Sequence, residues 1–432
     1  MIIKILDKLK KTNYKEIVNI LTIFYFVLIF FFWGIDSKYL EVKILTPVIF
    51  LTYIFLKNDL KDISKTKIYL FLVILSIHQI LIFFIYKNFF SYVNIIYFIY
   101  ICITILTAIF TFYLLKKNFF EILITFLFLF NIFFIIALIN YSLLFSISID
   151  CFGGIISEME FIFKESSHFA LVSAPTILSG LQFYFKKEEK KLSRIFFRVN
   201  YIIFILFSFL NISNIFLILI ICFGTLLLIK EKNYKKKTFL CILLILSIFF
   251  LINKSQCKNR LVLQIKKDLF ETSIFEPIFG QAKKVKKNDS RTINYSNENL
   301  SYEVFITSLK IAGLSIQENP FGVGINNYEF FFNEKIFNIK NISEQVKFLN
   351  RKDASNNFAK IIVEFGILGI ILYFWISKLI VKIDVNNPLE IFLIICISAQ
   401  SIRGVGYFIG SFMFMVSALY ILKINENKKN IS

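Results

Sequence analysis

Long apolar runs rich in Ile, Leu and Phe recur along this 432-residue chain and constrain its fold more than any other feature. A helix needs about 20 consecutive apolar residues to cross the hydrocarbon core of a bilayer, and many runs match that requirement. The chain is 57% hydrophobic, whereas soluble domains contain roughly 45–50% apolar residues. The sequence therefore predicts an all-α, polytopic membrane protein.

Short Lys-rich links separate the runs, and we expect about twelve transmembrane helices. The expected spans are residues 17–33, 44–56, 68–86, 92–115, 119–144, 167–185, 195–210, 214–229, 238–253, 355–377, 389–402 and 405–422. No small-residue cleavage site follows the first run, so we expect it to be a span and not a signal peptide. The seventh and eighth runs are nearly continuous, and the polar residues 211–214 are expected to separate them.

The charge of the links alternates, which predicts the orientation of the chain. One alternate set, which includes both termini, holds 26 Lys or Arg residues, and the short links of the other set hold five. Links rich in Lys and Arg stay in the cytoplasm, so both termini are expected there. The link 146–166 and the long polar insert 253–353 are expected outside. Because topology accounts for much of the net charge of +20, we expect no nucleic-acid partner.

The insert divides the chain into three expected parts. These are an N-terminal transmembrane bundle (1–252), a large extracytoplasmic loop (253–353), and C-terminal transmembrane helices with a cytoplasmic tail (354–432). A channel or a simple transporter has little need of such an insert, whereas an enzyme that acts on a lipid-linked substrate at the membrane surface does. The chain also lacks an internal repeat, which disfavours the two-half architecture of many transporters.

Apolar residues at helical spacing within the insert predict an amphipathic helix that lies on the membrane surface. They are Tyr302, Phe305, Ile306, Leu309, Gly313 and Ile316. The sequence Asn-Pro-Phe-Gly-Val-Gly at 319–324 is expected to end this helix, because Pro cannot continue a helix and Gly permits a turn. A second helix is expected over 328–350.

Glu165 and His168 stand at the outer end of the sixth span and would share one face of a helix. They are candidates for acid–base chemistry. The alternative is an interfacial helix cap, in which Glu complements the helix dipole, and the residues alone favour that alternative. The other histidine, His78, lies within the third span, where we expect it to pack or to hydrogen-bond another helix.

Two arginines on the outer side are candidates for binding an anionic group. Arg403 lies among apolar residues in the turn between the last two spans, together with Tyr407. An Arg at this depth is a functional hypothesis by default, and its planar guanidinium suits bidentate phosphate binding; the alternative is a topological anchor. Arg291 stands just before the expected amphipathic helix, and its alternative is one more solvated charge among the sixteen Lys and Arg of the insert.

The tenth span opens with Asp-Ala-Ser-Asn-Asn-Phe at 353–358 and contains Glu364. Asn356 and Asn357 are ordinary helix caps by position, with substrate binding as the alternative. A carboxylate within a span is costly, so Glu364 is expected to face a polar interior. Two of the six cysteines, Cys151 and Cys257, fall on the outer side, and a disulfide between them is an open alternative.

The order of these motifs resembles the O-antigen polymerase family, the repeat-unit polymerase branch of the polymerase and O-antigen ligase superfamily. The resemblance runs from Glu165 to Phe408. It rests on Glu-Ser-Ser-His-Phe-Ala, Ser-Arg before a helix, Asn-Pro-Phe-Gly-Val-Gly, Ser-Asn-Asn…Glu-Phe-Gly-Ile-Leu-Gly and Ile-Arg-Gly-Val-Gly-Tyr-Phe. The polymerase pattern often has Pro where this chain has Ser166. Ligases usually have a His-Asn pair after the large loop, where this chain has Ser-Asn-Asn at 355–357.

This resemblance implies a membrane glycosyltransferase of the C type, without a cofactor, nucleotide sugar or metal. Its substrate would be an undecaprenyl-diphosphate-linked oligosaccharide, polymerised into O-antigen or capsule at the outer face of the bacterial cytoplasmic (inner) membrane. Membrane lipids and the chain-length regulator and flippase of the same pathway are the implied partners. A ligase, or an exporter or flippase for the same lipid-linked sugars, is the alternative.

The same resemblance distributes roles among the candidate residues. Two arginines would clamp the diphosphate, a Glu–His pair would bind or deprotonate the acceptor, and three further side chains would contact the substrate. In that order the residues are Arg291 and Arg403, then Glu165 and His168, then Asn356, Asn357 and Tyr407.

Overall fold

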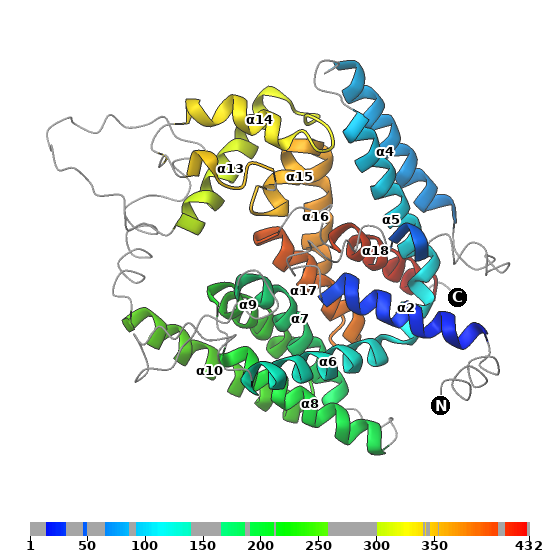
Figure 1. Ribbon diagram of the computed structural model, residues 1–432, viewed down its shortest axis with the longest axis vertical. Coiled ribbons are helices and arrows are strands. Elements are labelled where there is room, and N and C mark those ends of the chain that lie inside the picture. Colours follow the sequence, from blue (N-terminus) through cyan, green and yellow to red (C-terminus); the bar gives the residue numbers. More distant parts are fainter. Residues whose placement is uncertain are drawn as a thin grey trace, which may run out of the picture.

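Every regular element in the described part of the chain is a helix, as Figure 1 shows. The structure is a computed structural model that describes residues 14–31, 46–49, 65–85, 92–139, 166–185, 191–210, 213–257, 300–339, 342, 346–352, 354–404 and 411–429. These residues contain no strand. The all-α prediction is confirmed for this part of the chain.

The described helices before the insert coincide with the predicted apolar runs, except for the run 44–56, of which all but residues 46–49 lie outside the described residues. These helices are α2 (Tyr14–Phe31), α4 (Lys65–Ile85), α5 (Tyr92–Lys117), α6 (Phe119–Ile139), α7 (Ser166–Tyr184), α8 (Lys191–Leu210), α9 (Asn214–Lys230) and α10 (Tyr234–Cys257). The predicted break between the seventh and eighth runs is confirmed. Ser213 caps α9 there, and its hydroxyl accepts a hydrogen bond from the Phe216 amide at 3.2 Å.

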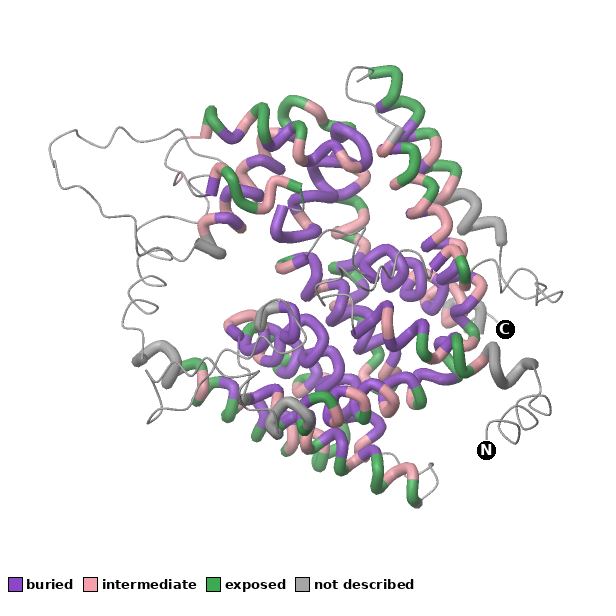
Figure 2. Tube along the Cα trace, viewed as in Figure 1, coloured by how far each residue is buried: buried purple, intermediate pink, exposed green. Residues whose placement is uncertain are grey.

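The remaining helices belong to the insert and to the C-terminal part. They are α13 (Leu300–Glu318), α14 (Tyr328–Lys335), the short 3₁₀ helices η4 (Ile336–Asn338) and η5 (Val346–Phe348), α15 (Asn357–Phe365), α16 (Ile367–Val381), α17 (Pro388–Ile402) and α18 (Phe412–Lys429). Helix α17 is the core of the bundle, and it packs against α7, α9 and α18. Its residues from Ile391 to Ile397 are almost completely buried (Figure 2).

Two helices, Val93–Lys117 and Leu192–Phe209, are long and apolar enough to cross a membrane on length and composition alone. Other apolar helices are shorter as described: Asn19–Phe31, Leu72–Ile85, Phe119–Ile135, Asn214–Lys230, Ile367–Val381 and Pro388–Ile402. The outward faces of several helices carry exposed apolar side chains. On α4 these are Val73, Ile77, Ile80, Leu81 and Phe84.

The tenth apolar run, predicted as one span over 355–377, is two helices, α15 and α16. Gly366 joins them with a left-handed φ of 57°. A Cβ atom added to Gly366 would lie 2.1 Å from the Pro320 carbonyl oxygen, so the insert backbone occupies the space that any side chain would need. The Ile367 amide donates a 2.9 Å hydrogen bond to that same carbonyl. Hydrophobic periodicity could not predict the break, because its cause lies in a distant segment.

Helix α13 confirms the predicted helix within the insert, and residues 319–320 end it as expected. The buried face, however, is not the predicted apolar one. It consists of small and polar residues with two larger aliphatic ones, namely Val304, Thr307, Ser308, Ile311, Ala312 and Ser315. This face packs on α15, while Phe305, Ile306 and Gly313 of the predicted face are only half-buried.

The second helix predicted in the insert is shorter than 328–350. Helix α14 ends at Lys335 and is followed by η4. The Lys335 ammonium pairs with the Glu318 carboxylate of α13 and with Glu334, each at 2.7 Å, and these two carboxylates raise its pKa above the ordinary value. Both contacts are partly exposed, so they orient α14 more than they stabilise it. A second hydrophobic core is formed by residues of α13 and α14 together with Ala359 and Val363 of α15. This core therefore includes residues from both sides of the predicted boundary between the loop (253–353) and the C-terminal part (354–432).

Several polar contacts between distant segments join residues that are predicted to lie on the same side of the membrane. Pairs at the expected cytoplasmic ends of spans are Asn118–Asn19 (2.7 Å), Lys236–Gln182 (2.5 Å) and Lys423–Glu390 (2.6 Å). Pairs between the expected outer end of a span and the insert are Asn94–Asn327 (2.7 Å) and Asn356–Ser308 (2.6 Å). These contacts are compatible with the predicted topology, in which the two sets of links lie at opposite ends of the bundle.

We expect Gly366→Ala to destabilise the fold strongly, because the new methyl group would overlap the Pro320 carbonyl oxygen. The matched control is Gly313→Ala in α13, where a Cβ meets no atom within 4 Å. That change should be neutral or stabilising by about 0.5–1 kcal/mol, since Ala favours a helix. Thermal unfolding of both variants in detergent measures the difference. Equal melting temperatures would contradict the steric account of the break.

Candidate functional site

The start of α15 and the end of α17 meet at Ser355. The Arg403 guanidinium, on the residue that caps the C-terminus of α17, donates a hydrogen bond to the Ser355 hydroxyl. The Gly404 amide donates to the Ser355 carbonyl oxygen at 3.1 Å. The structure therefore brings Arg403 beside the Ser-Asn-Asn sequence that was predicted, independently, to open a helix.

The backbone before α15 is strained at this junction. Ala354 and Ser355 both have a φ of 61°, in the left-handed region that residues with a side chain rarely adopt. A residue held in a sparsely populated backbone conformation costs on the order of 1–3 kcal/mol and persists only where its surroundings determine it. Here the surroundings are the buried Ala354 side chain in the second core and the two hydrogen bonds to Ser355.

Asn356 fixes the junction to the insert. It is the N-cap of α15, as predicted, and its Oδ1 accepts a 2.7 Å hydrogen bond from the Ala359 amide. Its Nδ2 donates to the Ser308 hydroxyl of α13 at 2.6 Å and to the Ala354 carbonyl at 3.1 Å. The side chain is completely buried. Its direct partners are protein groups, which gives Asn356 a positioning role at the site.

Asn357 differs from its neighbour. It is 0% exposed, yet among the described residues neither its Nδ2 nor its Oδ1 has a hydrogen-bond partner. A Cβ added to Gly404 would lie 2.8 Å from both Cγ and Nδ2 of this amide, so Gly404 allows the α17 end to approach it closely. A buried amide without a partner costs about 1–3 kcal/mol. This donor and acceptor, next to Arg403, are suited to a ligand that binds in the site.

A buried ion pair lies on α15 below this junction. The Lys360 ammonium is 3.9 Å from the Glu364 carboxylate, and the two side chains are 5% and 0% exposed. Lys360 also donates to the Lys352 carbonyl at 2.5 Å, and Glu364 accepts from the Asn326 amide at 2.8 Å. Glu364 does face a polar environment, as predicted, and its partner is Lys360. The sequence analysis did not single out Lys360, although its spacing of four residues from Glu364 is a signal that could have identified the pair.

The Asn-Pro-Phe-Gly-Val-Gly segment caps the other end of α15. The amides of Val323 and Gly324 donate to the carbonyl oxygens of Val363 and Glu364 at 2.9 and 3.0 Å. Carbonyls in the last turn of a helix have no partner within the helix, so this loop satisfies them. Gly322 has a φ of 81°, and a Cβ on it would lie 2.5 Å from the Glu364 carbonyl oxygen. The motif is therefore a docking segment for α15.

Side chains of α4 hold this segment from the opposite side. His78 Nε2 lies 2.7 Å from the Phe321 carbonyl oxygen, and its Nδ1 lies 2.8 Å from Gln79 Nε2. Because a carbonyl oxygen can only accept, Nε2 carries the proton and Nδ1 accepts from the Gln79 amide. The Gln79 Oε1 accepts in turn from the Ile325 amide at 3.2 Å. His78 is packed and hydrogen-bonded, as predicted, but its partner is the insert.

Asn94 of α5 completes this brace. Its Nδ2 donates to the Ile325 carbonyl at 2.9 Å and to the Asn327 Oδ1 at 2.7 Å. Sequence reasoning did not single out Gln79, Asn94 or Ser308. Each is one polar residue in an apolar or amphipathic helix, and only the fold identifies its partner.

His168 lies in the first turn of α7 and is 5% exposed. The next residue, Phe169, stacks on Phe130 of α6 with ring centroids 5.0 Å apart. Helix α7 packs against α17, whose end carries Arg403. The structure thus places His168 on a neighbour of the helix that carries the site.

Three other predicted site residues, Glu165, Arg291 and Tyr407, lie outside the described residues, as does Cys151. The structure consequently brings together Arg403, Asn356 and Asn357 from the predicted set and adds Ser308, Ser355 and Lys360. No protein-family model matches this chain, and no characterised protein is significantly similar to it in sequence.

We expect His78→Ala to loosen residues 319–327, because the change removes the Phe321 contact and frees Gln79. Amide hydrogen exchange of that peptide should accelerate by about tenfold, which corresponds to about 1.4 kcal/mol of local stability. Ser76→Ala on the same helix is the control, since the Ser76 hydroxyl donates to the Leu72 carbonyl of its own helix at 2.8 Å. Equal exchange in both variants would mean that the brace does not hold the loop.

Proposed function

We propose that this chain is an integral-membrane glycosyltransferase that polymerises undecaprenyl-diphosphate-linked oligosaccharide repeat units at the outer face of the bacterial cytoplasmic membrane. The product would be a surface polysaccharide such as O-antigen or capsule. The observation that carries the proposal is the junction at Ser355, where Arg403 and the buried amide of Asn357 lie together under the insert. Two of the motifs that resemble the O-antigen polymerase family, Ser-Asn-Asn at 355–357 and the Ile-Arg-Gly at 402–404, lie at this junction.

Support for a membrane location comes from the outward faces of the helices. A helix that is apolar on both its buried and its outer faces is typical of a bilayer-embedded bundle. Helix α4 exposes Val73, Ile77, Ile80, Leu81 and Phe84, and α10 exposes Ile242, Ile245, Leu246, Ile248 and Phe249. In water, such contiguous surfaces would be strongly unfavourable.

The chemistry requires little from the protein beyond charge and position. An acceptor hydroxyl attacks the anomeric carbon of the donor sugar, the bond from that carbon to the diphosphate oxygen breaks, and the hydroxyl proton passes to a base. The diphosphate leaves with the electron pair and gains negative charge. A guanidinium fixed beside it stabilises that charge as it develops. In the proposal Arg403 and Arg291 supply this stabilisation.

Asn357 would hydrogen-bond the substrate, with Tyr407 from the same outer turn as Arg403. Glu165 and His168 would bind the acceptor hydroxyl or take its proton. Asn356, Ser308 and the His78 brace act indirectly, because they hold α15 and α17 in place around the substrate. A cofactor has no part in this reaction, since the lipid diphosphate is already a good leaving group.

The topology of the proposal can be tested with two exposed positions. Gln317→Cys, at the end of α13, should react with a membrane-impermeant thiol reagent in intact spheroplasts, whereas Lys232→Cys, between α9 and α10, should not. Both sites are exposed in the fold, so accessibility differs only by the side of the membrane. The background lacks the native cysteines, and permeabilised cells give the total labelling. Labelling of position 232 in intact spheroplasts would contradict the orientation.

Purified protein in detergent, given a synthetic lipid-linked repeat unit, should produce a ladder of longer glycans on a gel. Arg403→Ala should abolish the ladder at normal protein levels, and Arg403→Lys should restore little, because Lys lacks the planar fork. Ser355→Ala is the control, since it removes the same hydrogen bond and keeps the charge. A ladder from Arg403→Ala would exclude the clamp. Transfer without a ladder from the native protein would favour a ligase, and no transfer at all would favour an exporter.

A further inference from the structure

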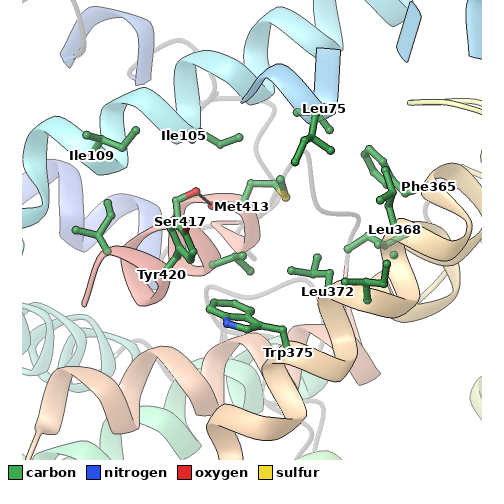
Figure 3. A pocket seen from close by; sticks show the side chains of 16 residues that line it. Leu75, Ile105, Ile109, Phe365, Leu368, Leu372, Trp375, Met413, Ser417 and Tyr420 are labelled. Atoms are coloured by element: carbon green, nitrogen blue, oxygen red, sulfur yellow. Dashed lines mark hydrogen bonds between the residues drawn. The ribbon is translucent and has the colours of Figure 1, made fainter. Parts of the chain in front are cut away.

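A nearly apolar cavity of about 390 Å³ lies between α4 and α5 on one side and α15, α16 and α18 on the other (Figure 3). Its volume falls within the roughly 300–1,000 Å³ typical of small-molecule pockets. The polar side-chain groups of its lining are the hydroxyls of Ser417 and Tyr420 and the indole N–H of Trp375, and Ser417 donates a hydrogen bond to the Met413 carbonyl at 2.7 Å. A polar ligand would lose its hydration there and gain few partners.

The cavity and the candidate site both lie along α15. Asn357 begins the helix at the Arg403 junction, and Ile361 and Phe365 line the cavity. At a rise of 1.5 Å per residue, these two residues lie about 6 and 12 Å further along the helix axis. A ligand with a polar head at Arg403 and an apolar chain along α15 would therefore reach the cavity.

The cavity also opens, through apolar residues, onto the exposed surface of the helix bundle. Ile74 of α4 and Ile371 of α16 line it and are 44% and 56% exposed. Leu372 and Trp375 of α16 also line the cavity (Figure 3). An empty apolar cavity destabilises a fold in proportion to its volume, and an apolar chain that fills it recovers the lost contacts.

We propose that this cavity binds the head-proximal part of the isoprenoid tail of the lipid carrier, while the diphosphate lies at Arg403. The proposal rests on the proposed function, which supplies a substrate with a polar head and a long branched apolar tail. In this proposal the first turn of α15 lies near the diphosphate, and the following turns contact the tail. Binding of the tail would set the depth of the diphosphate and thereby its approach to the guanidinium.

The test uses a polyprenyl phosphate with a photoreactive diazirine in its tail, added to the purified full-length protein in detergent. Illumination should label peptides of α16 or α18. Excess undecaprenyl phosphate should reduce this labelling on the order of tenfold, as expected for competition at one site, and the same concentration of phosphatidylglycerol should reduce it little. Labelling confined to other segments, or equal competition by phosphatidylglycerol, would overturn the assignment to an isoprenoid tail.

Two tryptophan substitutions on α16 separate the cavity from its surroundings. Leu372→Trp fills the cavity and should lower the labelling on the order of tenfold, since an overfilled apolar site excludes its ligand. Ile370→Trp is the matched control, because Ile370 is 43% exposed and does not line the cavity, and its labelling should equal that of the native protein. Native-level labelling of a folded Leu372→Trp variant would overturn the proposal. If that variant does not fold, the competition experiment on the native protein tests the proposal instead.

The labelling needs no sugar, so its outcome is separable from the outcome of the polymerisation assay. Competed labelling of α16 in a protein that builds no glycan would support the tail site and refute the polymerase. A glycan ladder from a protein that shows no such labelling would support the polymerase and refute the tail site.

Discussion

The contact between Gly366 and the Pro320 carbonyl is the constraint on which the outer part of this protein depends. It ends α15 after nine residues and redirects the chain into α16. Residues 319–324 then occupy the space beyond the last turn of α15 and satisfy its carbonyl groups. Since His78 holds the same segment from α4, a single loop connects the insert, the broken helix and the N-terminal bundle.

This arrangement explains how a short helix with an unfavourable start can be stable. The left-handed residues Ala354 and Ser355 cost free energy at the start of α15, as does the buried amide of Asn357, which has no hydrogen-bond partner among the described residues. The second hydrophobic core, which the insert shares with α15, and the hydrogen bond from Asn356 to Ser308 offset that cost. Strain and an unpaired polar group, concentrated beside an arginine, are typical of a site that is organised for a ligand before the ligand arrives.

Part of the candidate site could be predicted from sequence, because its residues break the local pattern. Arg403 is a charge among apolar residues, and the Asn pair at 356–357 precedes a helix. Neither fact indicated that the two would meet. Ser308, Gln79 and Asn94 gave no usable signal, since a single serine or amide in a helix has many ordinary explanations, and their partners lie from about 50 to about 250 residues away.

The sequence by itself determined that the described chain is helical and where most helices lie, because apolar runs and their polar boundaries act locally. It also determined the alternation of charge between links, which depends on composition alone. The tertiary structure decided that the tenth run is two helices, because the obstacle at Gly366 is the backbone of another segment. It also decided which face of α13 is buried. Periodicity identified the more apolar face, but close packing on α15 required the small residues Ser308, Ala312 and Ser315 on the other. Contacts between distant segments follow from shape and hydrogen-bond geometry, which hydropathy does not encode.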